Sequence, residues 1–227
     1  MCGRFSFYLT TAELEEYYGI HNEHSFDAHY NVAPQQYVPV ITQLNGIRHS
    51  EIMKWGLVPS WANDESVSNK LINARAETLA EKPSFRNSLK SRRCVIPISG
   101  FYEWKKQGKQ KYPYYISPEK TTHLPIAGLW DSWKNKDNRI IKTCTLITVE
   151  PNNQLKEIHN RMPAVLSQEQ IDIWLDEQSD IQHALLQLQP YREQLRITPV
   201  SNRVNSATCD TPELILEQKS ELWGLFD

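Results

Sequence analysis

The sequence predicts an α+β fold built around a curved, mostly antiparallel β-sheet. Its strand-like runs are short, β-branched and aromatic, which favours sheet over helix. A few helical segments lie between these runs, but strands and helices do not alternate regularly as they do in parallel α/β folds. The 227 residues contain no internal repeat and are enough to bury one sizeable core. We therefore expect a single domain over residues 1–227.

Three segments begin with a capping box, in which a Ser or Thr cap is followed three residues later by Glu or Gln. These pairs are Thr10 with Glu13, Ser167 with Gln170, and Ser179 with Gln182. They predict a helix through about Tyr18, a helix whose apolar face includes Trp174, and a third helix that Pro190 ends. We expect all three to be scaffold, with Trp174 in the core.

Four runs are predicted to form strands because they are rich in β-branched and aromatic residues and are bounded by turn-forming or polar segments. They are YVPVIT at 37–42, CVIPISGFYEW at 94–104, LPIAGLW at 124–130 and KTCTLITV at 142–149.

The composition is that of an ordinary globular protein, with 40% hydrophobic and 23% charged residues. The sequence shows neither a signal peptide nor an apolar run of the roughly 20 residues needed to cross a bilayer, so we expect a cytoplasmic protein. The four cysteines are not spaced as zinc ligands, and a disulfide framework is not expected in a reducing compartment. We expect no metal and no cofactor.

The net charge of −2 argues against bulk binding of nucleic acid, but the charge is unevenly distributed. Residues 73–104 contain six Lys or Arg against three acidic residues. This segment is either a local basic face or an ordinary mixed-charge surface, and charge alone does not decide between them.

The most unusual residue is Cys2. Because it is small, removal of Met1 is expected to make it the N-terminal residue, which then carries an α-amine and a thiol together. Five further segments combine Asn, Pro, Trp or charged residues in loop-like surroundings: YNVAP (30–34), KWGLVPSWAN (54–63), INARAET (72–78), ISGFYEW (98–104) and EIHNRMP (157–163). Taken singly, each has a structural interpretation. Glu103 fits an exposed strand position, His159 a hydrogen-bonded structural histidine, and Trp55 and Trp61 a core.

Taken together and in order, these motifs closely resemble the SRAP family, the SOS-response-associated peptidases that process abasic sites. The resemblance runs from MCGRF at the N-terminus to PVSNRVN at 199–205 and covers nearly the whole chain. It implies a single SRAP-type domain with a barrel-like core and peripheral helices. It also implies a DNA-damage protein that binds single-stranded DNA, shields abasic sites, and has associated lyase and autoproteolytic or peptidase activities.

The resemblance implies covalent capture of the lesion by Cys2. A ring-opened abasic site exposes an aldehyde, which an amine attacks to give a Schiff base. The thiol of the same residue then closes a five-membered thiazolidine. The family pattern implies that Asn73 holds the Cys2 amine or the sugar, that Glu103 transfers protons, and that His159 acts as a general acid or base. The same Schiff base opens a lyase route by β-elimination.

The resemblance also implies a DNA-binding surface. Three arginines are expected on phosphates, which give affinity without reading sequence: Arg4, Arg75 and Arg161. Four residues are expected to shape the cleft and offer an aromatic wedge or stacking platform: Asn31, Pro34, Trp55 and Trp61. Some relatives carry two adjacent aromatics where this chain has Trp61 followed by Ala62. The expected partner is single-stranded DNA containing abasic sites, with the protein a monomer that joins the nucleoid when bound and contacts no membrane.

Three other functions fit part of the sequence. A thiol peptidase or amidohydrolase would use Cys2 as its nucleophile and would survive blocking of the amine, which a thiazolidine would not. A class II glutamine amidotransferase also matures to an N-terminal Cys-Gly, but no glutamine-binding motif follows here. A non-catalytic single-strand-binding module explains the arginines and tryptophans but gives no role to Cys2, Glu103 and His159.

Overall fold

The computed structural model describes residues 2–21 and 25–218, and its core is a closed barrel of five strands. In spatial order these are β10 (Ile140–Val149), β4 (Ile47–Trp55), β3 (Tyr37–Leu44), β6 (Arg93–Ile98) and β9 (Leu124–Lys134), with β9 pairing back onto β10. All these pairs are antiparallel except β10 with β4. Two short strands, β5 (Asn73–Arg75) and β11 (Met162–Pro163), extend β10. The predicted α+β class and barrel-like, mostly antiparallel core are confirmed.

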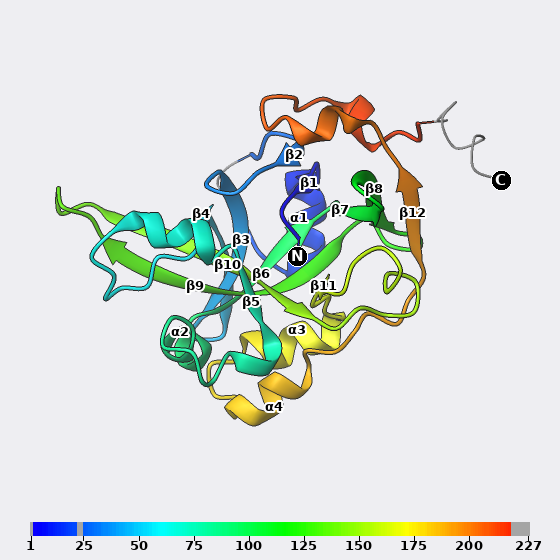
Figure 1. Cartoon of the computed structure of the whole chain (residues 1–227). Helices are drawn as coiled ribbons and strands as arrows, with labels where there is room; N and C mark the ends of the chain where they lie inside the picture. Colours follow the sequence, from blue (N-terminus) through cyan, green and yellow to red (C-terminus); the bar gives the residue numbers. More distant parts are fainter. Residues whose placement is uncertain (1, 22–24, 219–227) are drawn as a thin grey trace.

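A second sheet of five strands packs beside the barrel. Its order is β12 (Leu195–Pro199), β8 (Gln110–Pro118), β7 (Gly100–Gln107), β1 (Phe5–Phe7) and β2 (His29–Val32). Strand β1 therefore lies between two partners, and Figure 1 shows it at the centre of the molecule. An N-terminal segment that would otherwise fray is fixed by hydrogen bonds on both sides.

The chain passes from the barrel to the second sheet at Ser99. The sequence predicted one strand over 94–104, but the structure divides this run between β6 and β7. Ser99 joins both layers, because its N–H donates to Ser6 O at 2.8 Å and its Oγ accepts the Tyr8 N–H at 2.9 Å. The next residue must be glycine, since a Cβ on Gly100 would lie 2.4 Å from the Tyr115 hydroxyl.

Four α-helices cover the sheets: α1 (Thr11–Tyr18), α2 (Arg86–Ser91), α3 (Gln168–Leu175) and α4 (Ile181–Leu186). The predicted capping boxes of α1 and α3 are both present. The predicted start of the third helix is wrong by one residue, because Asp180 rather than Ser179 accepts the first free N–H groups of α4. None of the helices in the described ranges is long and apolar enough to cross a membrane.

Short 3₁₀ turns occupy several connections, as η1 (Glu65–Lys70), η2 (Ala76–Thr78), η3 (Asn202–Asn205) and η4 (Pro212–Ile215). In Figure 1 the segment that carries η3 and η4 lies above β2, while α2, α3 and α4 lie on the opposite side of the barrel.

The two sheets are joined by aromatic packing. Trp55 at the end of β4 is fully buried, and its ring centroid lies 4.8 Å from that of Phe5 on β1. Its indole N–H donates to Ile72 O at 2.9 Å. Trp174 is also fully buried, which confirms its predicted place in the core.

Candidate functional site

The register of β1 against β7 brings Cys2 to the edge of the second sheet. Phe5 pairs with Phe101, and the Tyr102 N–H donates to Arg4 O at 2.9 Å. Because the two strands are antiparallel, continuing this register by three residues brings Cys2 beside Glu103 and Trp104. Cys2 is 1% exposed, and its thiol approaches Arg4 O at 3.6 Å. Burial, reinforced by the nearby Glu103 carboxylate, raises the pKa of the Cys2 thiol far above its usual range.

Glu103 on β7 is 3% exposed and so is not the surface carboxylate that alternation along a strand would give. Burial raises the pKa of Glu103 to about 7, because a charged carboxylate loses its hydration there. At neutral pH this group is therefore divided between acid and base, which suits a residue that both donates and accepts protons.

Asn73 connects the barrel to the N-terminal segment. It lies on β5, where it pairs with Leu146 of β10, and its Nδ2 donates to Cys2 O at 2.8 Å. Its Oδ1 is buried and makes no hydrogen bond to any described residue. A buried amide oxygen without a donor costs free energy, so this atom is ready to accept a hydrogen bond from a bound group.

His159 lies before β11 and brings a second proton-transfer group to Glu103. Its Nδ1 is 3.8 Å from Glu103 Oε1 and accepts the Arg161 N–H at 3.1 Å. Burial lowers the pKa of His159, which favours the neutral ring. A neutral ring that accepts at Nδ1 carries its proton on Nε2 and can donate it there.

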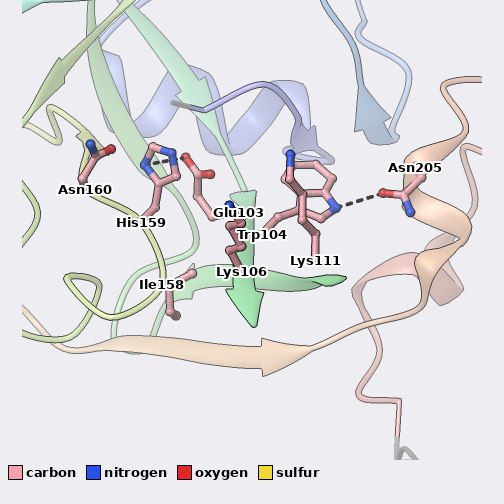
Figure 2. Close-up of a pocket in the computed structure, with 8 residues that line it drawn as sticks. All are labelled: Glu103, Trp104, Lys106, Lys111, Ile158, His159, Asn160 and Asn205. Atoms are coloured by element: carbon pink, nitrogen blue, oxygen red, sulfur yellow. Dashed lines mark hydrogen bonds and ion pairs between the residues drawn. The ribbon is translucent and has the colours of Figure 1, made fainter. Parts of the chain in front are cut away.

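A pocket of about 680 Å³ opens over Glu103 and His159. Figure 2 shows these two side chains on one wall and Trp104 with Asn205 on the other. The indole N–H of Trp104 donates to Asn205 Oδ1 at 2.9 Å, which fixes the ring. The remaining lining residues are Lys106, Lys111, Ile158 and Asn160. The pocket is thus polar, with a carboxyl group and an imidazole at its base.

Two of the predicted phosphate contacts, Arg75 and Arg161, differ in their exposure to solvent. Arg75 at the end of β5 is exposed. Arg161 is buried, and its guanidinium forms a two-bond ion pair with Glu77 at 2.8 and 2.9 Å while also donating to Thr148 O. The charge of Arg161 is therefore already balanced, because the bond to Arg161 lowers the pKa of Glu77 and keeps it ionised. Sequence reasoning missed Glu77, although it lies inside the INARAET motif.

Arg4 and Asn31 hold a segment from late in the sequence, residues 201–210, which we call the 201–210 strap. Arg4 Nη1 donates to Asn31 Oδ1 and to Val204 O, both at 2.9 Å. Asn31 is 1% exposed, and its Nδ2 donates to three strap carbonyls: Val204, Ser206 and Cys209. Both side chains position the strap and, through the Arg4 bond to Asn205 O, one wall of the pocket; their expected contacts with DNA stay predictions.

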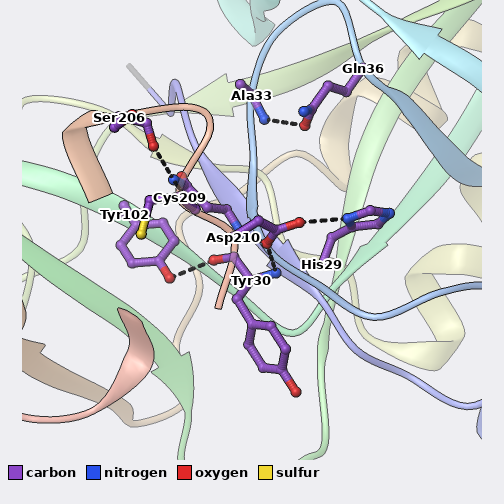
Figure 3. Close-up of polar contacts among 9 residues, drawn as sticks. His29, Tyr30, Ala33, Gln36, Tyr102, Ser206, Cys209 and Asp210 are labelled. Carbon is purple, nitrogen blue, oxygen red and sulfur yellow. Dashed lines mark hydrogen bonds and ion pairs between the residues drawn. The ribbon is translucent and has the colours of Figure 1, made fainter. Parts of the chain in front are cut away.

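A carboxylate completes this attachment. Asp210, the last residue of the strap, accepts hydrogen bonds from the Tyr30 N–H, the Asn31 N–H and His29 Nδ1 of β2 (Figure 3). On the other side of β2 the Tyr102 hydroxyl donates to Tyr30 O at 2.6 Å. The strap is therefore tied to the sheet that carries Glu103.

The predicted aromatic residues differ in exposure. Trp55 is fully buried against Phe5, which fits the core interpretation of this residue; its expected contact with DNA stays a prediction. Trp61 is 56% exposed in a turn that is anchored to β9 through the Trp133 indole bond to Ala62 O. Pro34 is half-buried in the turn between β2 and β3. Trp61 and Pro34 keep accessible surface, whereas Trp55 fills the core.

The basic segment 73–104 does not form one basic face. Arg93 is buried and donates to Trp174 O and Asp176 O, while Arg92 is paired with Asp131. Unpaired positive charge instead gathers at Lys106 and Lys111, which sequence reasoning did not select although the run KKQGKQK was visible. Within the described residues no cluster of three or more His, Cys, Asp or Glu side chains is arranged to hold a metal ion.

This arrangement can now be compared with known proteins. The sequence model of the family described as SOS response associated peptidase (SRAP) matches residues 1–207. The chain belongs to the SRAP family. Among its relatives, the abasic site processing protein YoqW of Bacillus subtilis is 39% identical over 95% of this chain and 99% of that protein. The abasic site processing protein HMCES of Gallus gallus is 34% identical over 82% of this chain and 65% of that protein.

Solved structures share the fold described above. A crystal structure of a protein from Bacteroides thetaiotaomicron superposes with a TM-score of 0.87 at 28% identity, covering 96% of this chain and all of the other. A protein from Bordetella bronchiseptica superposes with a TM-score of 0.76 at 22% identity, covering 88% of this chain and all of the other. The SRAP fold is therefore common to sequences that differ at most positions.

Proposed function

We propose that this SRAP protein processes abasic sites in single-stranded DNA by forming a covalent thiazolidine between Cys2 and the ring-opened aldehyde. The observation that carries the proposal is the convergence of four side chains from different elements on the N-terminal segment: Cys2, Asn73, Glu103 and His159. The names of the relatives, which describe abasic site processing, support the same substrate.

The first chemical step uses the amine of Cys2, which is available once Met1 has been removed. The amine nitrogen attacks the aldehyde carbon and gives a carbinolamine. Its hydroxyl then leaves as water after taking a proton from Glu103, whose pKa of about 7 keeps a neutral acid available. The product is an iminium on the same carbon. The pocket over Glu103 offers room for the sugar.

The second step closes the ring. Having given up its proton, Glu103 is a carboxylate and takes the proton of the Cys2 thiol, whose pKa burial has raised. The sulfur attacks the iminium carbon, and the nitrogen remains in the ring as a secondary amine. The net reaction is aldehyde plus cysteine giving thiazolidine plus water. Holding both nucleophiles beside one carbon replaces a random encounter with an oriented reaction.

Asn73 and His159 assist this reaction by hydrogen bonding and by proton donation. The unpartnered Asn73 Oδ1 accepts a hydrogen bond from the Cys2 amine or the sugar, while its Nδ2 fixes the Cys2 carbonyl. His159 donates from Nε2 to the sugar oxygen that is released as the ring opens. The same iminium permits loss of the 3′ phosphate by β-elimination, so lyase activity is a branch of the same mechanism.

The thiol environment does not favour the peptidase alternative. A cysteine nucleophile of a peptidase works as a thiolate, and its pKa is lowered by a neighbouring cation or imidazolium. Here burial and Glu103 raise the pKa of Cys2. A purely DNA-binding module would in turn leave the cost of burying Glu103 without a purpose.

The decisive experiment incubates the protein, with its N-terminus verified by intact mass, with single-stranded oligonucleotides that differ by one abasic site. A denaturation-resistant adduct should form only with the lesion. Cys2→Ala should abolish it, whereas Cys209→Ser, which alters a half-buried thiol elsewhere, should leave it intact. Protein that retains Met1 should also give no thiazolidine. Peptide cleavage without any adduct would replace this proposal with the thiol-peptidase function.

A further inference from the structure

The hairpin that carries Glu103 is strongly basic beyond the site. Residues 104–118 contain four lysines and no acidic residue, in a protein whose net charge is −2. These residues form the outer part of β7, the tip of the hairpin and β8. Two of the lysines, Lys106 and Lys111, line the pocket together with Glu103 and His159 (Figure 2).

Lys106 and Lys111 lie directly opposite each other in the antiparallel register of β7 and β8. Like charges at such a position repel and weaken the strand pair. Both side chains are exposed, and no ion pair within the described ranges joins either amine to a carboxylate. A bound anion would reduce this repulsion.

A second hairpin provides an internal comparison. The β9–β10 connection also carries exposed lysines, Lys134 and Lys136, but Asp137 lies among them. Its tip is ordered locally, because Asn135 Oδ1 accepts the N–H groups of Asp137 and Arg139. Figure 1 shows this hairpin projecting from the barrel on the side away from β8. Two exposed lysines are therefore present at each hairpin, but of these two hairpins only β7–β8 lines the pocket.

We propose that Lys106 and Lys111 together bind a backbone phosphate of the DNA strand next to the abasic nucleotide. This inference rests on the proposed function, since it takes the pocket over Glu103 as the position of the abasic sugar. The phosphates on either side of that sugar lie within a few ångströms of it, and the positive charges of the two lysines that line the pocket attract such a phosphate. The contact fixes the direction in which the strand leaves the site.

The test compares the double variant Lys106→Gln/Lys111→Gln with the matched control Lys134→Gln/Lys136→Gln. Both remove two exposed lysines from a hairpin. Binding of an intact, lesion-free single strand is measured over a range of salt concentrations. The pocket variant should bind about tenfold more weakly at low salt, and the slope of log K against log salt should fall by about 0.7, the value for one phosphate contact. The control should match the wild type. Equal slopes in both variants would overturn the proposal.

A second measurement locates the phosphate. Replacing one phosphate at a time by a neutral methylphosphonate should, at a single position beside the lesion, remove the difference between wild type and the pocket variant. If no position does so, the lysines act only by non-specific electrostatic attraction of the DNA, and the proposal is wrong. Because lesion-free DNA is used for the salt series, that readout remains valid even if no covalent adduct forms.

Discussion

The barrel and the second sheet are built from similar strands, but the barrel is closed whereas the second sheet is open. In the barrel every strand has at least two neighbours, and residues such as Ile41 and Leu146 are fully buried. The second sheet stays open and carries β1, β7 and the lysine-rich hairpin. The residues of the proposed chemistry, among them Asn73 on β5 and Glu103 on β7, come from both sheets and meet at the N-terminal segment.

Glu103 and Thr145 illustrate the difference in cost. The buried hydroxyl of Thr145 in the barrel, which makes no hydrogen bond to a described residue, costs less than a buried carboxyl group, which must give up its charge or lose its hydration. The barrel therefore supplies the stability that permits Glu103 to remain buried. The comparison teaches that stability and reactivity should respond to different substitutions.

The largest effect on stability should come from the barrel. Trp55→Ala removes a fully buried indole and its bond to Ile72, and we expect a loss of about 3–5 kcal/mol in the free energy of unfolding. Trp55→Phe should cost less and remain folded for assay. Urea unfolding gives the stability, and binding of single-stranded DNA by the Phe variant should stay within twofold of wild type. A larger loss of affinity would show that Trp55 reaches the DNA.

Glu103→Gln should have the opposite effect on stability. Folding raises the pKa of Glu103 from 4.5 to about 7. The contribution of neutral Glu103 to the stability of the wild type is therefore fully present below pH 4.5 and is lost as the pH rises through 7. The neutral amide removes this loss, which amounts to about 3 kcal/mol at pH 8. Thermal unfolding at pH 5 and pH 8 measures it. Crosslinking by the same variant should be slower by about 100-fold.

A smaller pH effect on the reaction follows from the same group. Above pH 7 the neutral acid form of Glu103 declines, so the rate of iminium formation should fall on the alkaline side of its profile. Glu103→Gln should lack this alkaline limb. A profile of the same shape in both proteins would assign the proton transfer to another group.

Releasing the 201–210 strap should have an intermediate effect. Asn31→Ala removes the Asn31 hydrogen bonds to the Ser206 and Cys209 carbonyls and one of the acceptors of Arg4, with an expected loss of about 2 kcal/mol. Hydrogen exchange of strap amides should accelerate, and crosslinking should slow as the Asn205 wall moves. Thr10→Ala, which removes the α1 cap at a cost of about 1 kcal/mol, serves as the control that destabilises without touching the strap.

The smallest effect on stability should come from Arg75→Ala. This exposed side chain is expected to change the free energy of unfolding by less than about 0.5 kcal/mol while weakening DNA binding about fivefold. Arg161→Ala should lower the free energy of unfolding more than it lowers DNA affinity, because it leaves Glu77 without this partner and opens a buried site. Similar losses of affinity and stability in both variants would contradict the distinction between them.

The fold class, the α1 and α3 caps and the core position of Trp174 could be predicted because each depends on neighbouring residues or on local periodicity. The division of residues 94–104 at Ser99 could not, because hydrophobicity runs through both strands and only pairing partners distinguish them. The buried state of Asn31 escaped prediction for the same reason, and the sequence alone does not decide whether Trp55 belongs to the cleft or to the core. A motif marks a residue as special without saying whether it faces solvent.

The site residues could be predicted from the family resemblance but not from local sequence patterns. Asn73, Glu103 and His159 are each surrounded by ordinary strand or loop sequence, and only the paired strands bring them to Cys2. The partners Glu77, Asn205 and Asp210 were missed because their role appears only when segments distant in the sequence meet.

The contact between Arg4 and Val204 spans 200 positions of the chain. During synthesis the N-terminal cysteine therefore leaves the ribosome long before the strap that completes its surroundings exists, since chains grow at about 5–20 residues per second. The surroundings of the proposed reactive residue are thus complete only after nearly the whole chain has been made, so this N-terminal site is among the first parts to be synthesised and among the last to be finished.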